Sequence, residues 1–258
     1  MSGSIAVTIE GSIATLVIDN PGQRNALTPE MLRDIATQLG RLGDADAVRV
    51  AVLQGRGAAF SSGYALDKFP TGDDLGETDD IDVACEAIER SRLVVIALIQ
   101  GPCVGAALEV AASCDFRFAE ANAGLGITPV KFGLVYKWRG IERIYRLVGP
   151  SHARELFFTG QLISAERAER IGLVNEVCAD GPAVERRTYE FAEQLGGLAP
   201  IALAGNKWIF CELERLTTPT KEVRSALHRM RCIAIDSKDA IEARKAFAEK
   251  RAPKFTGS

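Results

Sequence analysis

The chain has 258 residues, of which 47% are hydrophobic, and its formal net charge is −3. It can therefore build a sizeable core, while its low charge and dispersed basic residues argue against a nucleic-acid-binding surface. No apolar run approaches the roughly 18 residues of a membrane helix, and the N-terminus lacks the basic and apolar regions of a signal peptide.

Two apolar stretches open the chain. Ser4–Glu10 and Ile13–Asp19 are rich in branched residues, and a glycine between them, Gly11, predicts that they pair as a hairpin. Thr28 and Pro29 then indicate the start of a helix, because Thr is a good N-terminal cap and Pro suits the first helical position.

The next segments alternate between strand and helix patterns. Residues 48–54 predict a buried strand, and 67–82, rich in Pro, Gly and acids, is the most loop-like part of the chain. A helix is expected at 82–92. The uncharged run 93–99 then predicts a strand that is buried on both faces.

The segment that follows has the most distinctive composition in the chain. Residues 104–114 are small or apolar and predict a buried helix, with one acid, Glu109, inside it. A helix start without large side chains lets a ligand approach the free backbone N–H groups, which favour negative charge. The pattern indicates a site for a developing oxyanion with a carboxylate beside it.

The remainder of the chain predicts further strands and helices and then helices alone. Strands are expected at 116–119, 125–127 and 174–177, and helices at 140–148, 151–159 and 164–171. Alternating strands and helices favour a largely parallel sheet. We therefore predict an α/β core over residues 1–199 and a helical extension over residues 200–258.

Four ordered blocks of residues resemble the crotonase superfamily, which includes enoyl-CoA hydratases and isomerases. The blocks span the whole chain in the family's order and spacing. They are Asn20-Pro21 with Arg24-Asn25-Ala26-Leu27, then Phe60-Ser61-Ser62-Gly63-Tyr64, then Gly101 to Asp115, and the tail from Asp236 to Phe255.

The resemblance implies a fold, a substrate class and an assembly. The expected fold is a crotonase-type spiral of ββα repeats with a helical C-terminal trimerisation region. The expected partners are an acyl-CoA thioester and other copies of the chain, as a homotrimer or a dimer of trimers, with no nucleic acid and no membrane. Coenzyme A is part of the substrate, so no separate cofactor is expected. The six scattered cysteines, without metal-ligand spacing, indicate free thiols in the cytoplasm and no metal site.

The same resemblance assigns residues to the thioester and to CoA. The backbone N–H groups of Tyr64 and Ala106 would hold the thioester oxygen, since preorganised N–H donors stabilise an enolate. The expected CoA-binding residues are Arg24, Ala26, Ala59, Ser61, Gly63, Leu66, Gly105, Lys207 and Lys250.

Two positions that are glutamates in hydratases of the family limit the reactions that this chain is expected to catalyse. Glu109 matches the first, but Pro129 stands at the second and cannot transfer a proton. Isomerases that need the second acid are therefore disfavoured, and a hydratase would depend on Glu109 alone. Since Glu109 has no cation near it on its own helix, we do not expect a carboxylate that is merely paired within the core.

The stretch from Ile127 to Tyr136 is similar to the methylmalonyl-CoA decarboxylase branch of the family, and so are Phe69-Pro70 and the tail. The resemblance implies that Thr128 binds the substrate carboxylate and that Tyr136, or water beside it, protonates the α-carbon. One departure is Tyr64, where that branch tends to have His.

Three hypotheses on function follow. The first is decarboxylation of a methylmalonyl-CoA-like substrate, and the second is hydration of a 2-enoyl-CoA by a single glutamate. Either activity would make the protein a carbon–carbon or carbon–oxygen lyase. The third is a CoA-binding or RNA-associated relative without chemistry. The presence of Gly63, Gly105 and Glu109 in the expected blocks counts against the third hypothesis, and so does the lack of a row of basic residues.

Overall fold

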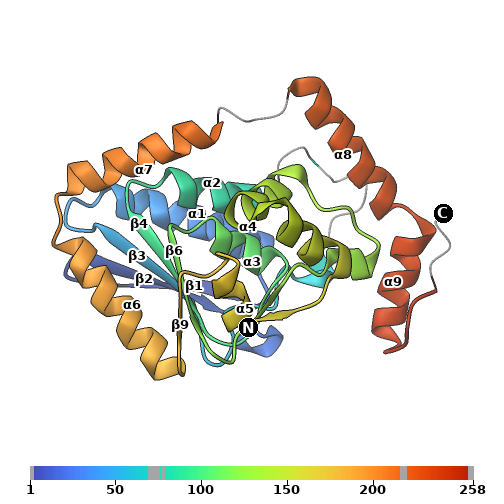
Figure 1. Cartoon of the computed structure of the whole chain (residues 1–258), viewed down its shortest axis with the longest axis horizontal. Helices are drawn as coiled ribbons and strands as arrows, with labels where there is room; N and C mark the ends of the chain where they lie inside the picture. Colours follow the sequence, from blue (N-terminus) through green and yellow to red (C-terminus); the bar gives the residue numbers. More distant parts are fainter. Residues whose placement is uncertain (1–2, 69–75, 77–78, 216–219, 255–258) are drawn as a thin grey trace.

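A computed structural model describes residues 3–68, 76, 79–215 and 220–254 (Figure 1). Phe69, Pro70 and Phe255, which contribute to the family resemblance, lie outside these residues, as does much of the acidic segment 67–82. Among the helices of the described ranges, none is long and apolar enough to cross a membrane.

Two sheets form the core. The larger has six strands in the order β1 (Ser4–Glu10), β2 (Ile13–Asp19), β3 (Val50–Gly55), β4 (Val94–Ile99), β6 (Phe116–Glu120) and β9 (Glu176–Cys178). Only the β1–β2 pair is antiparallel, so the prediction of a largely parallel sheet is confirmed. The smaller sheet contains β5 (Cys103–Val104), β7 (Gly124–Gly126) and β8 (Ile163–Ser164).

Nine α-helices appear in the described residues, besides short 3-10 helices. They are α1 (Pro29–Asp44), α2 (Asp80–Arg90), α3 (Ala106–Ala112), α4 (Trp138–Thr159), α5 (Ala165–Arg170), α6 (Gly181–Gly196), α7 (Pro200–Arg215), α8 (Lys221–Ile235) and α9 (Lys238–Ala248). Figure 1 shows α6 on one side of the larger sheet and α1, α2 and α7 on the other.

The central strands are buried on both faces, as their uncharged sequences predict. Alternate side chains of a strand point to opposite faces. Val50 and Val52 pack in the apolar cluster that includes Val184 of α6, whereas Ala51 and Leu53 belong to the larger cluster on the side of α1, α2 and α3. Burial of both faces explains why these strands read as continuous apolar runs.

Several element boundaries agree with the sequence. The hairpin has the predicted bounds, and Thr28 caps α1 by accepting a hydrogen bond from the Met31 N–H at 3.3 Å. The helix predicted at 82–92 begins earlier, at Asp80, because Asp79 accepts a bond from the Asp82 N–H and caps it.

Other boundaries differ from the prediction. The helix expected at 104–114 is the shorter α3, because Cys103–Val104 pair with β7 as a strand and Gly105 has a φ of 59°. The helices expected at 140–148 and 151–159 both lie within α4, and the predicted break between them is confirmed by the non-helical Gly149, where φ is 73°; the first helix begins earlier than predicted, at Trp138. The strand expected at 174–177 forms two residues later, as β9.

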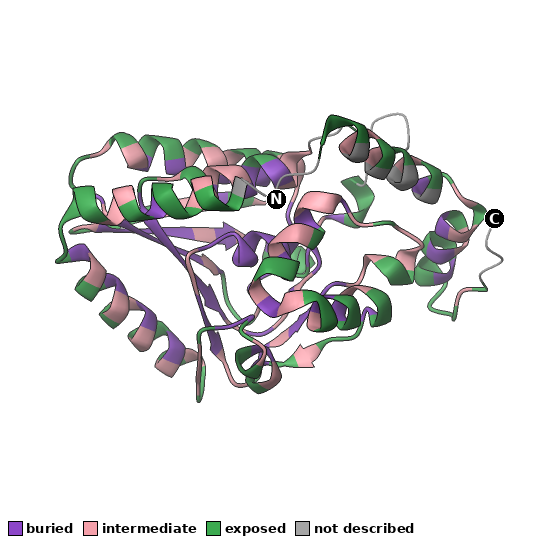
Figure 2. Cartoon of the chain, turned by 45° about the horizontal axis from the view of Figure 1, so that its top comes forward, coloured by how far each residue is buried: buried purple, intermediate pink, exposed green. Residues whose placement is uncertain are grey.

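The C-terminal helices differ in how they meet the core. Helix α7 begins at Pro200, where the helical extension was predicted, and is mostly exposed or half-buried (Figure 2). Its side chains Ile201, Trp208 and Phe210 are between 65 and 88% exposed. Helix α9 instead packs on the short 3-10 helix η4 (Pro129–Phe132), where the Phe132 and Phe247 rings lie 5.3 Å apart. The C-terminal segment thus contacts the loop between Thr128 and Tyr136.

Candidate active site

The two predicted oxyanion segments lie side by side. Ser61 forms a parallel β-bridge with Cys103, and the Val104 N–H donates to the Ser61 carbonyl at 3.2 Å. A Cβ on Gly63, where φ is 101°, would lie 2.6 Å from the Val104 carbonyl oxygen and 3.7 Å from the Ala106 nitrogen. Only glycine permits this approach, which brings the backbone before Tyr64 to the start of α3.

The backbone segments of Tyr64 and Ala106, the two predicted oxyanion donors, therefore lie next to each other. Ala106 is the first residue of α3, so its N–H has no partner within the helix. Backbone hydrogen bonds with Leu27 hold the residues on both sides of Tyr64. The Leu27 N–H donates to the Gly63 carbonyl, and the Ala65 N–H donates to the Leu27 carbonyl. Burial, with Asp80 as the largest charged contributor, raises the pKa of the Tyr64 hydroxyl to about 12.

Thr128 lies beside the same helix start. Its Oγ1 is 4.0 Å from the position that a Cβ on Gly105 would occupy, and it directly precedes η4. The structure thus places the Thr128 hydroxyl near Gly105, directly before the start of α3.

Glu109 is fully buried, and both of its carboxylate oxygens are occupied. Oε2 accepts a hydrogen bond from the Tyr136 hydroxyl at 2.6 Å. Oε1 accepts one from Arg143 Nη1 at 2.8 Å and lies 3.4 Å from Lys137 Nζ. The expectation that Glu109 is not a paired core carboxylate was wrong. Its cations come from α4 and the residue before it, not from α3.

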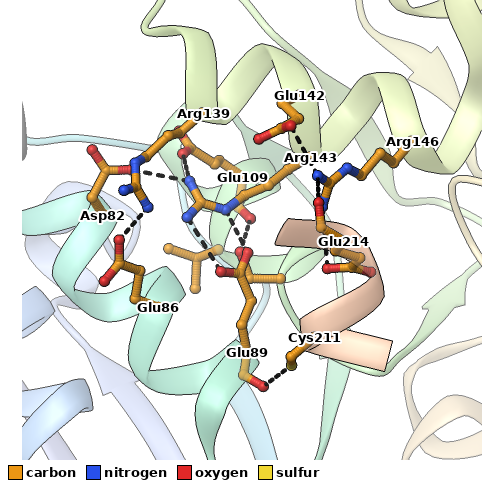
Figure 3. Close-up of polar contacts among 12 residues, drawn as sticks. Asp82, Glu86, Glu89, Glu109, Arg139, Glu142, Arg143, Arg146, Cys211 and Glu214 are labelled. Atoms are coloured by element: carbon orange, nitrogen blue, oxygen red, sulfur yellow. Dashed lines mark hydrogen bonds and ion pairs between the residues drawn. The ribbon is translucent and has the colours of Figure 1, made fainter. Parts of the chain in front are cut away.

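Lys137 and Arg143 also form ion pairs with acids of α2 and with Asp79, the residue that caps this helix. Lys137 Nζ lies 2.7 Å from Asp79 Oδ1 and 3.1 Å from Asp82 Oδ1. Arg143 lies 3.0 Å from Asp82 Oδ1 and 2.6 Å from Glu89 Oε1. Figure 3 shows Arg143 between these acids and Glu109. We call Asp79, Asp82, Glu89, Glu109, Lys137 and Arg143 the charge cluster. It links α2, α3 and α4 through ion pairs whose two cations are buried, while two of its acids, Asp79 and Glu89, are partly exposed.

The charge cluster shifts the protonation of its neighbours. Burial raises the pKa of the Tyr136 hydroxyl well above its ordinary value, and the adjacent Glu109 carboxylate raises it further, so this side chain stays a neutral donor. Burial alone would lower the pKa of Lys137, but Glu109, Asp79 and Asp82 outweigh it and raise that pKa. Lys137 therefore keeps its charge.

A glycine on α4 makes the contact between Tyr136 and Glu109 possible. A Cβ on Gly140 would lie 2.2 Å from Tyr136 Cε1 and 2.7 Å from Glu109 Oε2. The helix can pack on the pair only because this position has no side chain. Neither Gly140 nor the cations Lys137 and Arg143 emerged as site residues from the sequence. Their placement depends on the direction in which α4 crosses α3.

Most residues predicted to bind CoA cluster near the oxyanion segments. Arg24 is exposed with a φ of 52°, and its carbonyl accepts from the Ser62 N–H. Asn25 Nδ2 donates to the Ala59 carbonyl at 2.7 Å, and Ser61 Oγ accepts from the Gly63 N–H at 3.1 Å. Ala26 is buried next to Arg24, and Leu66 is exposed in the 3-10 helix η2 (Leu66–Lys68).

The two lysines predicted to reach CoA have different surroundings. Lys207 is 7% exposed, and its Nζ donates to the Leu93 carbonyl at 2.8 Å and to Asp115 Oδ2 at 2.7 Å. These bonds fasten α7 to the sheet and contradict a CoA-binding role for Lys207. Lys250 is exposed just beyond α9, a position that leaves its ammonium accessible.

A cavity of about 950 Å³ lies behind the charge cluster, between α2, α4 and α7. Glu89 and Arg143 reach its wall, together with Arg146, Lys207 and Phe210. Within the described part of the chain, Tyr64, Ala106 and Thr128 do not line it. The cavity is therefore separate from the oxyanion segments, although it gives access to the far side of Arg143.

Comparisons with known proteins agree over the whole chain. The sequence pattern of the enoyl-CoA hydratase/isomerase family matches residues 8–258. An enoyl-CoA isomerase/hydratase of Mycosarcoma maydis is 31% identical over 256 residues, which cover 94% of this chain and 92% of the relative.

Solved structures give the same result. A methylmalonyl-CoA decarboxylase in complex with 2-nitronate-propionyl-CoA superposes with a TM-score of 0.92 at 28% identity, covering 98% of each chain. A crystallised enoyl-CoA hydratase/isomerase family member superposes with a TM-score of 0.76 at 30% identity, covering 99% of this chain and 97% of that one.

Proposed function

The chain belongs to the enoyl-CoA hydratase/isomerase family, whose fold it shares, and we propose that it decarboxylates a methylmalonyl-CoA-like substrate. The observation that carries this proposal is that both carboxylate oxygens of Glu109 already have hydrogen-bond or ion-pair partners. A hydratase that depends on one glutamate needs a carboxylate oxygen free to take a proton from water. Here Oε2 holds the Tyr136 hydroxyl, and Oε1 holds Arg143 and Lys137.

The remaining groups suit decarboxylation. The Tyr64 and Ala106 N–H groups bind the thioester oxygen, and the Thr128 hydroxyl donates to the substrate carboxylate. With that carboxylate perpendicular to the thioester plane, the bond to CO2 breaks and its electron pair enters the thioester as an enolate. The two N–H groups stabilise the enolate, and one such donor is typically worth about 3–4 kcal/mol of barrier.

The last step is protonation of the α-carbon. The raised pKa of Tyr136 disfavours a tyrosinate beside Glu109. A water molecule held by the Tyr136 hydroxyl therefore supplies the proton, and the hydroxide left behind is neutralised by CO2 or solvent. The thioester accepts the electrons, so the proposed reaction needs no metal and no cofactor beyond the CoA of the substrate.

Hydration of a 2-enoyl-CoA is the second candidate. Glu109 supports it because this acid lies in the first turn of α3, next to the predicted oxyanion donor Ala106. The relative from Mycosarcoma maydis, named for both isomerase and hydratase activity, supports it as well. This candidate requires Glu109 to leave its three partners during turnover.

We further propose that the protein is a cytoplasmic homotrimer or a dimer of trimers. Support comes from α7, where Ile201, Trp208 and Phe210 form an exposed apolar surface of the kind that subunit contacts cover. All six cysteines are free, which suits a reducing compartment. Arg24, Ala59 and Ser61 are proposed to contact CoA, with Lys250 as the remaining candidate for its phosphates.

The decisive experiment compares two substrates. Methylmalonyl-CoA and crotonyl-CoA are incubated separately with the enzyme, and propionyl-CoA and 3-hydroxybutyryl-CoA are quantified by mass. Propionyl-CoA as the main product supports the decarboxylase. Hydroxybutyryl-CoA as the main product would instead assign Glu109 to hydration. If neither forms, titration with CoA separates an enzyme for another acyl group from a non-catalytic CoA-binding protein.

A further inference from the structure

The charge cluster contains more acids than cations. Four carboxylates, those of Asp79, Asp82, Glu89 and Glu109, share two cations. Each cation contacts Glu109 and also at least one acid from α2 or its cap. Glu109 is therefore tied to a neighbouring helix from one oxygen, while Tyr136 holds the other.

We propose that Lys137 and Arg143 determine which reaction this site performs, because they hold Glu109 in a conformation in which it cannot take a proton from water. This inference rests on the proposed decarboxylase function. It assigns Lys137 and Arg143 as positioning residues that act through Glu109, with no contact to substrate required.

The arrangement explains why both cations are needed. The bond from Tyr136 takes only one acceptor site of the carboxylate, on Oε2, so Oε1 can still accept a proton. Arg143 occupies Oε1 and is itself fixed by two further acids, Asp82 and Glu89. Lys137 adds a second positive charge at 3.4 Å from the same oxygen and directly follows Tyr136 in the chain. The backbone that positions the hydroxyl therefore also positions the ammonium.

Release of Glu109 predicts a new activity with a defined chemistry. The freed carboxylate takes a proton from water, and the water oxygen bonds to C3 of an enoyl-CoA. The electron pair of the C2–C3 double bond moves toward the thioester, giving the enolate held by the predicted oxyanion donors. Glu109 then returns the proton to C2, so that one water molecule is added in total. A site that already stabilises an enolate lacks only the base.

The test measures a gain of function, which structural damage does not produce. The Arg143→Ala and Lys137→Met variants are assayed with crotonyl-CoA, and each should hydrate it at least about tenfold faster than the wild type, a modest share of what a positioned base supplies. Arg143→Lys keeps the charge and should stay near the wild-type rate. Adding Glu109→Gln to Arg143→Ala should abolish the gain.

The matched control is Arg139→Gln. Arg139 lies one turn before Arg143 on α4 and forms an ion pair with Glu86 of α2, so its loss removes an α2–α4 ion pair without touching Glu109. This variant should show no hydration gain. All variants are checked for folding by circular dichroism and for CoA binding by titration.

Chemical rescue gives a second readout. The cavity behind the charge cluster reaches Arg143, so free guanidinium can enter the space that the missing side chain leaves. Millimolar guanidinium chloride should suppress hydration by Arg143→Ala and leave hydration by Lys137→Met unchanged.

Two results would overturn the inference. The first is that the Arg143→Ala and Lys137→Met variants both fold and bind CoA but do not hydrate crotonyl-CoA. The second is that the wild type and both variants hydrate crotonyl-CoA at the same rate. Propionyl-CoA formation by the wild type tests the proposed function separately. If the variants gain hydration while the wild type does not decarboxylate methylmalonyl-CoA, the positioning role of Lys137 and Arg143 stands and the proposed substrate is wrong.

Discussion

Replacement of Gly140 by alanine tests the contact at the centre of the site. An alanine Cβ would lie 2.2 Å from Tyr136 Cε1 and 2.7 Å from Glu109 Oε2, and both atoms belong to buried or half-buried groups that cannot simply swing away. Alanine gains at most about 1 kcal/mol over glycine in helix propensity. Overpacking costs about 1–3 kcal/mol, and loss of a hydrogen bond to a charged group costs about 1.5–3 kcal/mol. The variant should therefore lose about 2–5 kcal/mol of unfolding free energy.

The matched control for this substitution is Gly40→Ala. Gly40 lies within α1, is exposed, and has nothing within 4 Å of an added Cβ. It should gain up to about 1 kcal/mol from helix propensity alone. Urea unfolding of both variants gives the two values, and methylmalonyl-CoA turnover of Gly140→Ala should fall with its stability. An unchanged or raised unfolding free energy for Gly140→Ala would refute the close packing of α4 on Tyr136 and Glu109.

Three further predictions concern single side chains. Tyr136→Phe should slow decarboxylation by about 10²-fold, in the range of lost proton-transfer assistance, while CoA affinity stays constant; a change in affinity alone would place Tyr136 in the pocket wall. Lys207→Met should lower the unfolding free energy by about 1.5–3 kcal/mol, since it removes the ammonium from the partly exposed Asp115, which then keeps, within the described residues, only its bond from the Val95 N–H. The same variant should leave CoA affinity unchanged, whereas Lys250→Ala should weaken CoA binding without a loss of stability. Because the pKa of Lys137 is raised on folding, its stabilising charge is fully present below the unfolded value of about 10.4 and is lost only as pH rises through the higher folded value. Wild-type hydration of crotonyl-CoA should accordingly stay silent up to about pH 10, and its appearance near pH 8 would contradict the role of Lys137.

Local sequence predicted the elements that depend on neighbouring residues. The hairpin bounds follow from alternating and branched residues, and the start of α1 follows from Thr28 and Pro29. The partners of Glu109 could not be predicted in this way, because Tyr136 and Arg143 lie 27 and 34 residues away. Only the course of the chain after η4 determines which side chains meet α3.

The role of Lys207 shows a different limit of sequence reasoning. A resemblance transfers a residue type to a position, but it does not say whether that side chain points to solvent or to the core. In this chain the Lys207 ammonium binds the Leu93 carbonyl, directly before β4, and Asp115, directly before β6. The lysine therefore joins α7 to the sheet.

The helix that offers the predicted oxyanion donor is fixed at both ends by groups other than its own hydrogen bonds. At its C-terminal end the buried Arg117 guanidinium donates to the Cys114 and Leu173 carbonyls, and a cation there complements the helix dipole. Near its N-terminal end Glu109 is fastened to α4 through the charge cluster. Donors that do not move when charge develops stabilise a transition state without a reorganisation cost. The ion pairs that we propose withdraw Glu109 from proton transfer also fasten α3, the helix that begins with Ala106. Under this proposal, rigidity of the predicted oxyanion donor and loss of the base have the same structural cause.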